Sequence, residues 1–235
     1  MDVFCRREIK YLITDQQRSA LEAELAKYME PDPFPHSSIR NIYYDTPDFR
    51  LIRYSLEHPV YKEKLRIRCY GGGGQVFLEM KKKYMGIVYK RRVQVSQELA
   101  YAFMEGQCPL PDSQIGRELT YFRDFYQNLR PQVFLRYERD SWLGKQDPGL
   151  RLTMDRDIFY RMDDLRMDSL GGGEAVLEPG WSLMEVKAEN AIPLWLTELL
   201  ARLQITKVSF SKYGRAYERE LRRVMQKKRG NSYVG

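Results

Sequence analysis

The sequence predicts an α+β protein whose sheet is antiparallel and makes up the larger part of the fold. Alternation of apolar and charged residues indicates eight strands, most of them close in sequence and joined by short turns, as antiparallel strands are. Five helices are expected beside them, without the regular strand–helix–strand alternation of a parallel sheet. The hydrophobic share of 43% is enough for a packed core and excludes general disorder.

The expected elements can be placed in order along the chain. The strands lie near residues 3–13, 39–45, 60–70, 75–83, 87–96, 132–142, 150–155 and 182–188, and the helices near residues 15–29, 97–105, 113–129, 193–203 and 212–227. Gly71–Gly74 falls between two alternating strands and predicts a hairpin turn. The acidic stretch from Asp163 to Gly180 predicts a loop. Neither Gly71–Gly74 nor the second glycine cluster, Gly171–Gly173, is followed by the Lys-Ser/Thr and helix of a phosphate loop.

Residues 1–235 are expected to form a single domain, since this length is normal for one barrel or sandwich. The cysteines Cys5, Cys69 and Cys108 are widely spaced and odd in number, which argues against a disulfide framework and favours a reducing compartment. No apolar run reaches the roughly 18–20 residues that a membrane helix needs, and the N-terminal residues do not resemble a secretory leader. We therefore expect a cytoplasmic protein without a membrane segment.

The formal net charge of +7 favours a polyanionic partner: nucleic acid, an anionic membrane or a chain of phosphates. A basic surface that only keeps the protein soluble would produce the same number. The pattern within the strands helps to choose between these interpretations.

Side chains alternate between the two faces of a strand, and in seven strands one face is charged. The charged faces carry Arg6, Glu8 and Lys10; Lys62, Lys64, Arg66 and Arg68; Glu79, Lys81 and Lys83; Lys90 and Arg92; Arg136 and Glu138; Arg151, Thr153 and Asp155; and Glu185 and Lys187. In one strand this pattern is typical of a solvent-exposed face. Repeated in seven strands, the excess of lysine and arginine implies repulsion that a bound anion would relieve. If the sheet closes into a barrel, these residues are expected to line it, with helices on the apolar outer face.

Seven short motifs in a fixed order resemble one protein family. They are Arg6-x-Glu8-x-Lys10-Tyr11, Tyr43-Tyr44-Asp45-Thr46, Lys64-x-Arg66-x-Arg68, Leu78-Glu79-Met80-Lys81, Leu135-Arg136-Tyr137, Met184-Glu185-Val186-Lys187 and Ser209-Phe210-Ser211-Lys212-Tyr213. From about Phe4 to Tyr217 the chain resembles the VTC domain, the polyphosphate polymerase domain of the vacuolar transporter chaperone family, within the triphosphate tunnel metalloenzymes. The hydrolase and cyclase branch opens with Glu-x-Glu-x-Lys, so Arg6 favours the VTC branch.

The resemblance implies an antiparallel β-barrel tunnel with flanking helices. It also implies transfer of the ATP γ-phosphate onto a growing polyphosphate chain, with Mn²⁺ or Mg²⁺ as cofactor. The expected partners are ATP and polyphosphate or other phosphate anions, and no nucleic acid. The SPX domain and membrane spans of the eukaryotic complex have no counterpart in this sequence. Whether a separate membrane protein is a partner is therefore left open. The oligomeric state is not indicated.

Site residues are carried over from the resemblance by position. Catalytic roles are implied for Lys10, Arg66, Arg68, Lys81, Arg136 and Glu185. Phosphate oxygens would be bound by Lys10, Lys64, Arg66, Arg68, Lys81, Lys90, Arg92, Arg136, Arg151, Lys187, Lys207 and Lys212. Glu185 would hold the metal, with Glu8 as a second ligand, while Glu79 would orient neighbouring cations. Arginine forks match phosphate oxygens, and phosphoryl transfer depends mainly on positioning and charge neutralisation, so no Ser-His or Cys-His pair is required.

Three other interpretations share much of this pattern. A hydrolase of triphosphate or short polyphosphate would use nearly the same residues. A module that binds polyphosphate without turnover would need the cations but gain little from Glu185. Nucleic-acid binding is compatible with the 17 tyrosines and many arginines, although most of these tyrosines fall where strand cores are expected.

Overall fold

The computed structural model describes residues 7–71, 75–85, 87–169, 171–189 and 191–231, with side chains up to residue 226. The start of the first expected strand, with Cys5 and Arg6, lies outside this part, as do residues 72–74 of the expected hairpin turn. The strands on either side of that turn do pair in antiparallel fashion, as predicted.

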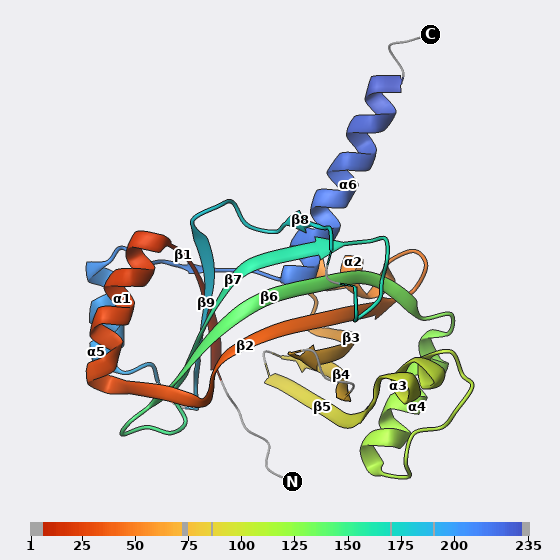
Figure 1. Ribbon diagram of the computed structural model, residues 1–235, viewed down its shortest axis with the longest axis horizontal. Coiled ribbons are helices and arrows are strands. Elements are labelled where there is room, and N and C mark those ends of the chain that lie inside the picture. Colours follow the sequence, from red (N-terminus) through yellow and green to blue (C-terminus); the bar gives the residue numbers. More distant parts are fainter. Residues whose placement is uncertain (1–6, 72–74, 86, 170, 190, 232–235) are drawn as a thin grey trace.

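One antiparallel sheet runs through the molecule in the order β10-β1-β9-β7-β6-β2-β3-β4-β5, with β8 beside β7 (Figure 1). The strands are β1 (Arg7–Thr14), β2 (Met29–Asp45), β3 (Tyr61–Tyr70), β4 (Gln75–Tyr84), β5 (Ile87–Ser96), β6 (Arg130–Gly144), β7 (Arg151–Arg161), β8 (Glu174–Ala175), β9 (Trp181–Ala188) and β10 (Lys207–Val208). The helices are α1 (Asp15–Tyr28), α2 (Arg50–Leu56), α3 (Gln97–Met104), α4 (Gln114–Tyr126), α5 (Leu194–Arg202) and α6 (Lys212–Asn231). The α+β class with flanking helices is confirmed.

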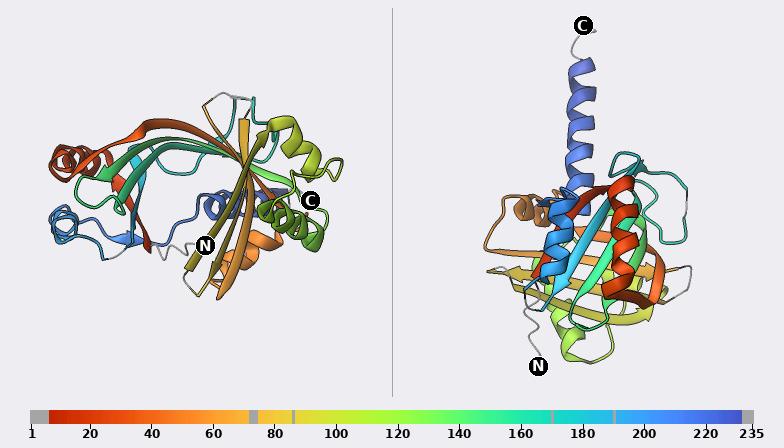
Figure 2. Two further views of the ribbon diagram at one scale, coloured as in Figure 1. Left: turned by 90° about the horizontal axis from the view of Figure 1, so that it is seen from below. Right: turned by 90° about the vertical axis from the view of Figure 1, so that its left-hand side faces the viewer.

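The sheet is curled into an arch. Strands β1 and β4 are far apart in the strand order, yet Lys81 Nζ of β4 lies 3.2 Å from Glu8 Oε2 of β1. Seen along its axis, the arch has β2, β6 and β7 at its crown (Figure 2, left). Within the described residues the strand order ends at β10 and β5, so hydrogen bonds do not close the expected barrel. The interior is nevertheless enclosed on three sides like a tunnel.

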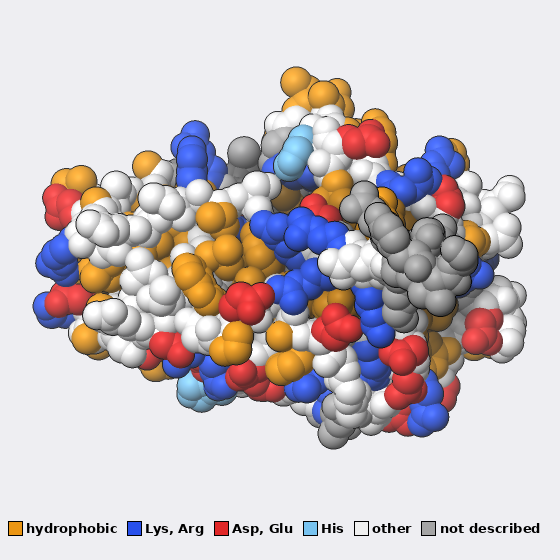
Figure 3. All heavy atoms as spheres, turned by 90° about the horizontal axis from the view of Figure 1, so that it is seen from above, with side chains coloured by type: hydrophobic (Ala, Val, Ile, Leu, Met, Phe, Trp, Pro, Cys, Tyr) orange, Lys and Arg blue, Asp and Glu red, His pale blue; other side chains and the backbone are white. Residues whose placement is uncertain are grey.

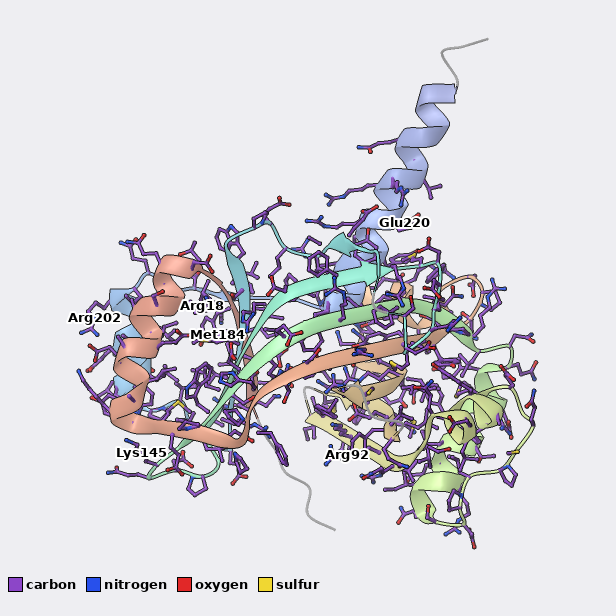
Figure 4. All side chains as sticks on the ribbon, in the orientation of Figure 1. Arg18, Arg92, Lys145, Met184, Arg202 and Glu220 are labelled. Atoms are coloured by element: carbon purple, nitrogen blue, oxygen red, sulfur yellow. The ribbon has the colours of Figure 1, made fainter. Side chains whose placement is uncertain are left out.

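Helices cover the outer face of the arch on both sides. On one side Leu21 of α1 and Leu196 of α5 pack in one core cluster with Met184 of β9, whose side chain points toward α1 (Figure 4). On the other side Phe103 of α3 and Phe122 of α4 pack against β3 and β4. Burying one such side chain contributes roughly 1.5–3 kcal/mol, so these two layers stabilise the curvature.

The inner face is divided into an apolar part and a charged part. Phe210 and Tyr213, at the start of α6, pack on Tyr43, Val133 and Leu135 inside the arch. The charged residues expected to line the barrel therefore share the interior with an apolar core cluster. The charged side chains occupy the remaining inner surface.

Two strands are longer than the sequence indicated, and α2 was not expected. β2 begins at Met29, in a stretch whose prolines, Pro31, Pro33 and Pro35, are typical of a loop. A shift of register between Pro31 and His36 accommodates the irregular backbone against β6. β7 continues past the predicted end at residue 155 to Arg161.

Helix α6 begins inside the arch and projects away from the body of the protein (Figures 1 and 2). Its first residues, Lys212 and Tyr213, are largely buried, whereas residues 221–226 are exposed. In the described part of the chain, no helix combines the length and the apolarity needed to cross a membrane.

Candidate functional site

The strand register brings the charged side chains of several strands onto the inner face of the arch. Residues directly opposite in neighbouring strands share a face, and Lys10 is opposite Glu185 while Lys64 is opposite Lys81. We call the resulting group the inner basic cluster. It consists of the cations Lys10, Lys64, Arg66, Arg68, Lys81, Lys90, Arg139, Lys187 and Lys212 and the carboxylates Glu8, Glu79, Asp155 and Glu185. Cations outnumber carboxylates about two to one.

Glu79 organises three cations at one side of the cluster. Its Oε2 accepts hydrogen bonds from Arg66 Nη2 at 2.6 Å and Nε at 2.9 Å, while Lys90 Nζ lies 2.7 Å from its Oε1 and Arg68 Nε 3.9 Å from its Oε2. Burial alone would raise the pKa of Glu79, but the charges of Arg66, Arg68 and Lys90 hold it far below its usual range. The ionised carboxylate therefore orients these cations, in agreement with the role expected for it.

Arg68 is held rigidly inside the arch. Its Nε donates to Asn41 Oδ1 at 2.8 Å, its Nη2 to the Tyr137 hydroxyl at 3.0 Å and its Nη1 to the Tyr70 hydroxyl at 3.3 Å. These three neutral acceptors orient the guanidinium, and the Glu79 carboxylate lies within ion-pair distance of its Nε. The side chain is thus positioned to stabilise an anion.

Glu185 lies at the centre of the other side of the cluster. Its Oε1 is 3.4 Å from Lys10 Nζ and 3.6 Å from Lys212 Nζ, and its Oε2 is 3.6 Å from Lys187 Nζ and 4.0 Å from Arg139 Nη2. Burial opposes ionisation, yet the charges of Lys212, Lys10 and Lys187 keep the pKa of Glu185 well below its ordinary value. The carboxylate is therefore ionised at neutral pH.

Asp155 holds two of the cations around Glu185 in place. It is fully buried and accepts hydrogen bonds from Arg139 Nε at 2.6 Å and Nη2 at 2.7 Å, and a third from Lys212 Nζ. Arg139 was not among the residues expected in the site. The available signal was the alternation of β6, which puts Arg139 on the same face as Tyr137.

The prediction that Arg136 contributes to the interior is wrong. Arg136 is directly opposite Arg40 of β2 and Phe159 of β7, and these residues lie on the outer face of the sheet. The inner face of β6 carries Tyr137 and Arg139 instead. The alternation of residues separates the two faces of a strand but does not indicate which face turns inward. In β6 the face that carries both Arg136 and Glu138 is the outer one.

Lys207 and Arg151 differ in their relation to the cluster. Lys207 is exposed and opposite Tyr11, which packs in the outer core cluster, so the structure does not bring it to the interior. Arg151 is opposite Lys187 and continues the inner row, although its Nη2 is 2.7 Å from Asp32 Oδ2.

Arg92 lies at the open edge of the sheet on β5 (Figure 4). It is opposite Glu79, so it shares the inner face, and its guanidinium carbon is 4.8 Å from the Phe77 ring centroid. The side chain is exposed, and it extends the charged surface of the cluster toward the open edge.

Lys64 lacks the compensation that most members of the cluster have. Its Nζ donates to Ser211 Oγ at 2.8 Å, and within the described residues no carboxylate oxygen lies within 4 Å of it. Burial, followed by the charges of Lys10 and Lys81, lowers the pKa of Lys64 to about 7. Ser211 also accepts a hydrogen bond from the Gly214 amide at 3.0 Å, so the N-terminus of α6 adds positive potential here.

Glu8 and Glu185 are the carboxylates that could hold a divalent cation. Although burial disfavours ionisation of Glu8, the charges of Lys81 and Lys10 lower its pKa to about 2 against the opposing charge of Glu185. Among the described residues no three His, Cys, Asp or Glu side chains are grouped to hold a metal ion. Two ionised carboxylates fit Mg²⁺ or Mn²⁺ if phosphate or water oxygens complete the coordination shell.

Viewed from the end where α6 leaves the body, lysine and arginine side chains gather near the middle of the molecule beside a hollowed apolar surface (Figure 3). The arrangement combines fixed guanidiniums, mobile ammonium groups and a few ionised carboxylates. Such a set of groups can hold a chain of phosphates and neutralise charge on it.

A curled antiparallel sheet with a basic interior is the triphosphate tunnel fold. A protein from Bacillus halodurans provisionally described as an adenylate cyclase has 18% sequence identity and a TM-score of 0.57, covering 89% of this chain and 94% of its own. A Pyrococcus horikoshii protein has 13% identity and a TM-score of 0.54, covering 91% and 99%. A Vibrio parahaemolyticus protein with the same provisional description as the first has 12% identity and a TM-score of 0.54, covering 92% and 99%. These likenesses concern the fold.

Within this fold, the chain belongs to the VTC domain family. The sequence model of the VTC domain matches residues 5–220, nearly the whole chain, and this confirms the resemblance seen in the motifs. No curated protein sequence matches the chain significantly.

Proposed function

We propose that the protein is a metal-dependent polyphosphate polymerase that transfers the γ-phosphate of ATP to the end of a growing polyphosphate chain. The observation that carries this proposal is Lys64, a half-buried cation that repels its neighbours Lys10 and Lys81 and has no carboxylate partner within 4 Å among the described residues. A phosphate chain in the arch would supply the missing negative charge. Membership of the VTC domain family supports a polyphosphate- or triphosphate-related activity.

The residues divide into groups with separate tasks. Arg66 and Arg68, fixed by Glu79 and by neutral hydroxyl and amide groups, would hold phosphate oxygens in two-pronged contacts. Lys10 and Lys81 would follow phosphate oxygens as point charges on flexible stems. The terminal phosphate of the chain would be the nucleophile. Positioning and charge neutralisation then supply most of the rate acceleration.

Mn²⁺ or Mg²⁺ would be held by Glu185 and Glu8 together with oxygens of the substrate. When bound, such an ion neutralises charge on the phosphoryl group being transferred. The four cations around Glu185 keep its carboxylate ionised and oriented toward the interior, which prepares it for this role.

ATP and polyphosphate or other phosphate anions are the proposed partners, and nucleic acid is not among them. We further propose that residues 1–235 act as one domain in the cytoplasm. A membrane partner and the number of copies in the assembly are left open by the features described above.

The test is to incubate the purified protein with ATP and Mn²⁺ and to separate the products on a gel stained for polyphosphate. We expect a ladder of long chains that disappears on addition of EDTA. Glu185→Gln should abolish the ladder while binding of tripolyphosphate is kept. Glu30→Gln, the same charge change at an exposed position of β2, is the matched control and should retain it.

Other outcomes would point elsewhere. Release of inorganic phosphate from tripolyphosphate without a ladder would replace the polymerase with a hydrolase. Binding of tripolyphosphate without any product would indicate a binding module. Normal turnover by the Glu185→Gln variant would refute the metal assignment.

A further inference from the structure

Two arginines face each other on the outer surface of the arch, away from the inner basic cluster. Arg136 of β6 is directly opposite Arg40 of β2, and Arg161 of β7 lies in the neighbouring row. Like charges on directly opposite positions destabilise a sheet. Burial lowers the pKa of Arg161, and the charge of Arg136 adds to this effect, so these two guanidiniums also repel each other.

These three arginines are unusual in lacking an acidic partner. Among the described arginines that are buried or half-buried, they are the ones without a carboxylate oxygen within 4 Å. The others, Arg18, Arg66, Arg68, Arg91, Arg123, Arg139, Arg156 and Arg219, each have such a partner. The charges of Asp164 and Asp163 still act on Arg161 and raise its pKa against the effect of burial. The positive charge without an acidic partner therefore lies mainly on Arg40 and Arg136.

Two of the three arginines use their donors to hold the loop that follows β7. Arg161 is only 5% exposed and donates to backbone carbonyls. These carbonyls belong to Asp164, Arg166, Ser169 and Gly171. Arg40 donates one hydrogen bond from Nη1 to the carbonyl of Met167 at 3.1 Å. Its remaining donors are directed at no acceptor within the described residues.

Arg136 is positioned but has no acceptor. Its guanidinium carbon lies 4.4 Å from the Phe159 ring centroid, which fixes the plane of the group. Its Nε is buried without a hydrogen-bond partner, and none of its nitrogens donates to another described residue. A buried donor without a partner is energetically unfavourable. Such a cost is relieved when a ligand supplies the acceptor.

We propose that Arg136 and Arg40 bind a phosphate group on the outer face of the arch, at a site separate from the interior. A phosphate offers several acceptor oxygens and up to two negative charges, which suits guanidinium groups at two directly opposite positions. Arg136, stacked on Phe159, provides the fixed contact, and Arg40 the second. The group can be free inorganic phosphate or the terminal phosphate of a longer chain. This inference does not depend on the activity proposed for the interior.

The experiment measures binding of inorganic phosphate and, in a second arm, of tripolyphosphate by equilibrium dialysis. The interior is first weakened with Arg66→Met, so that a further loss of affinity caused by a substitution on the outer face can be detected. Adding Arg136→Met, which keeps an apolar stem over Phe159, should reduce this remaining affinity at least tenfold. Arg130→Met, an exposed position on the same strand, is the matched control and should leave it unchanged.

A second measurement needs no variant of the site. In the ¹⁵N-labelled wild-type protein, the Nε–Hε signal of Arg136 should shift in a saturable way as phosphate is added. A stronger response to tripolyphosphate than to phosphate would assign the site to chain ends, and the reverse to free phosphate. Unchanged affinity in the Arg136→Met variant, or an Arg136 signal that stays still at saturation of the remaining site, would overturn the proposal.

Discussion

Replacing Lys64 with methionine should stabilise the empty protein and weaken its binding of phosphate chains. Methionine has a similar volume and removes an ammonium group that Lys10 and Lys81 repel. The pKa of Lys64 is lowered to about 7 from an ordinary value of about 10.4, and each unit corresponds to about 1.4 kcal/mol. The penalty at neutral pH is therefore at most about 4 kcal/mol.

Relaxation of the surrounding side chains and water reduces this upper limit. We expect the free energy of unfolding of Lys64→Met to rise by about 1–3 kcal/mol. At this chain length about 1 kcal/mol of stability corresponds to a change in Tm of about 2–4 °C. The increase in Tm should therefore be at least a few degrees and at most about 10 °C. Loss of a charged hydrogen bond to phosphate should at the same time reduce the affinity for tripolyphosphate by roughly 10- to 100-fold.

Thermal unfolding without ligand and calorimetric titration with tripolyphosphate measure the two effects on the same preparations. Lys207→Met is the matched control, because Lys207 is an exposed lysine on the outer side of β10. It should change neither quantity appreciably. A Lys64→Met protein that is less stable than wild type and binds tripolyphosphate equally well would refute the proposal that the Lys64 ammonium group is stabilised by a bound anion.

Three further predictions concern the same cluster. Arg66→Ala should weaken binding of ATP and tripolyphosphate at least tenfold in a calorimetric titration, and unchanged affinity would argue against a binding role for the inner face. Asp155→Asn, which breaks a buried ion pair with Arg139, should lower the free energy of unfolding by about 3–5 kcal/mol. A decrease in Tm of less than about 2 °C would contradict this prediction. The lowered pKa values of Lys64 and Lys187, about 7 and about 8, mean that the unfolded chain binds more protons than the folded one between about pH 7 and 10. Their contribution to stability therefore rises with pH in that window. Bound phosphate favours the charged forms of Lys64 and Lys187, so phosphate binding at pH 8 should be accompanied by uptake of protons. Equal calorimetric binding heats in buffers of different ionisation enthalpy would exclude this proton uptake.

The sequence predicted the fold class and the inner residues of β1, β3, β4 and β9 because their alternation is regular. Lys64, Arg66 and Arg68 share one face of β3 with apolar residues opposite, and a curled sheet has only one concave side. Once one strand is oriented, the register of its neighbours orients the others. This part of the candidate site could be read from residue type and spacing alone.

The sequence could not show which face of β6 turns inward. One face carries Arg136 and Glu138, and the other Tyr137 and Arg139, so both combine polar with bulky residues. The choice is made by long-range contacts, since the hydroxyl of Tyr137 accepts from Arg68 in a strand distant in sequence. The proline-containing start of β2 was missed for a related reason, because its strand conformation depends on pairing with β6.

The pairing of the chain's two ends has a consequence for how the protein is made. Lys10 Nζ donates to the carbonyl of Phe210, 200 residues away, and within the described residues β1 pairs with β9 and β10. Contacts of such sequence separation form slowly, because the loop between them must first be closed. A ribosome-bound chain that lacks its last strands therefore carries Lys64 and Arg66 without the half of the arch that contains Glu185. Under the proposed function, the complete phosphate site forms only after β9 and β10 have been synthesised.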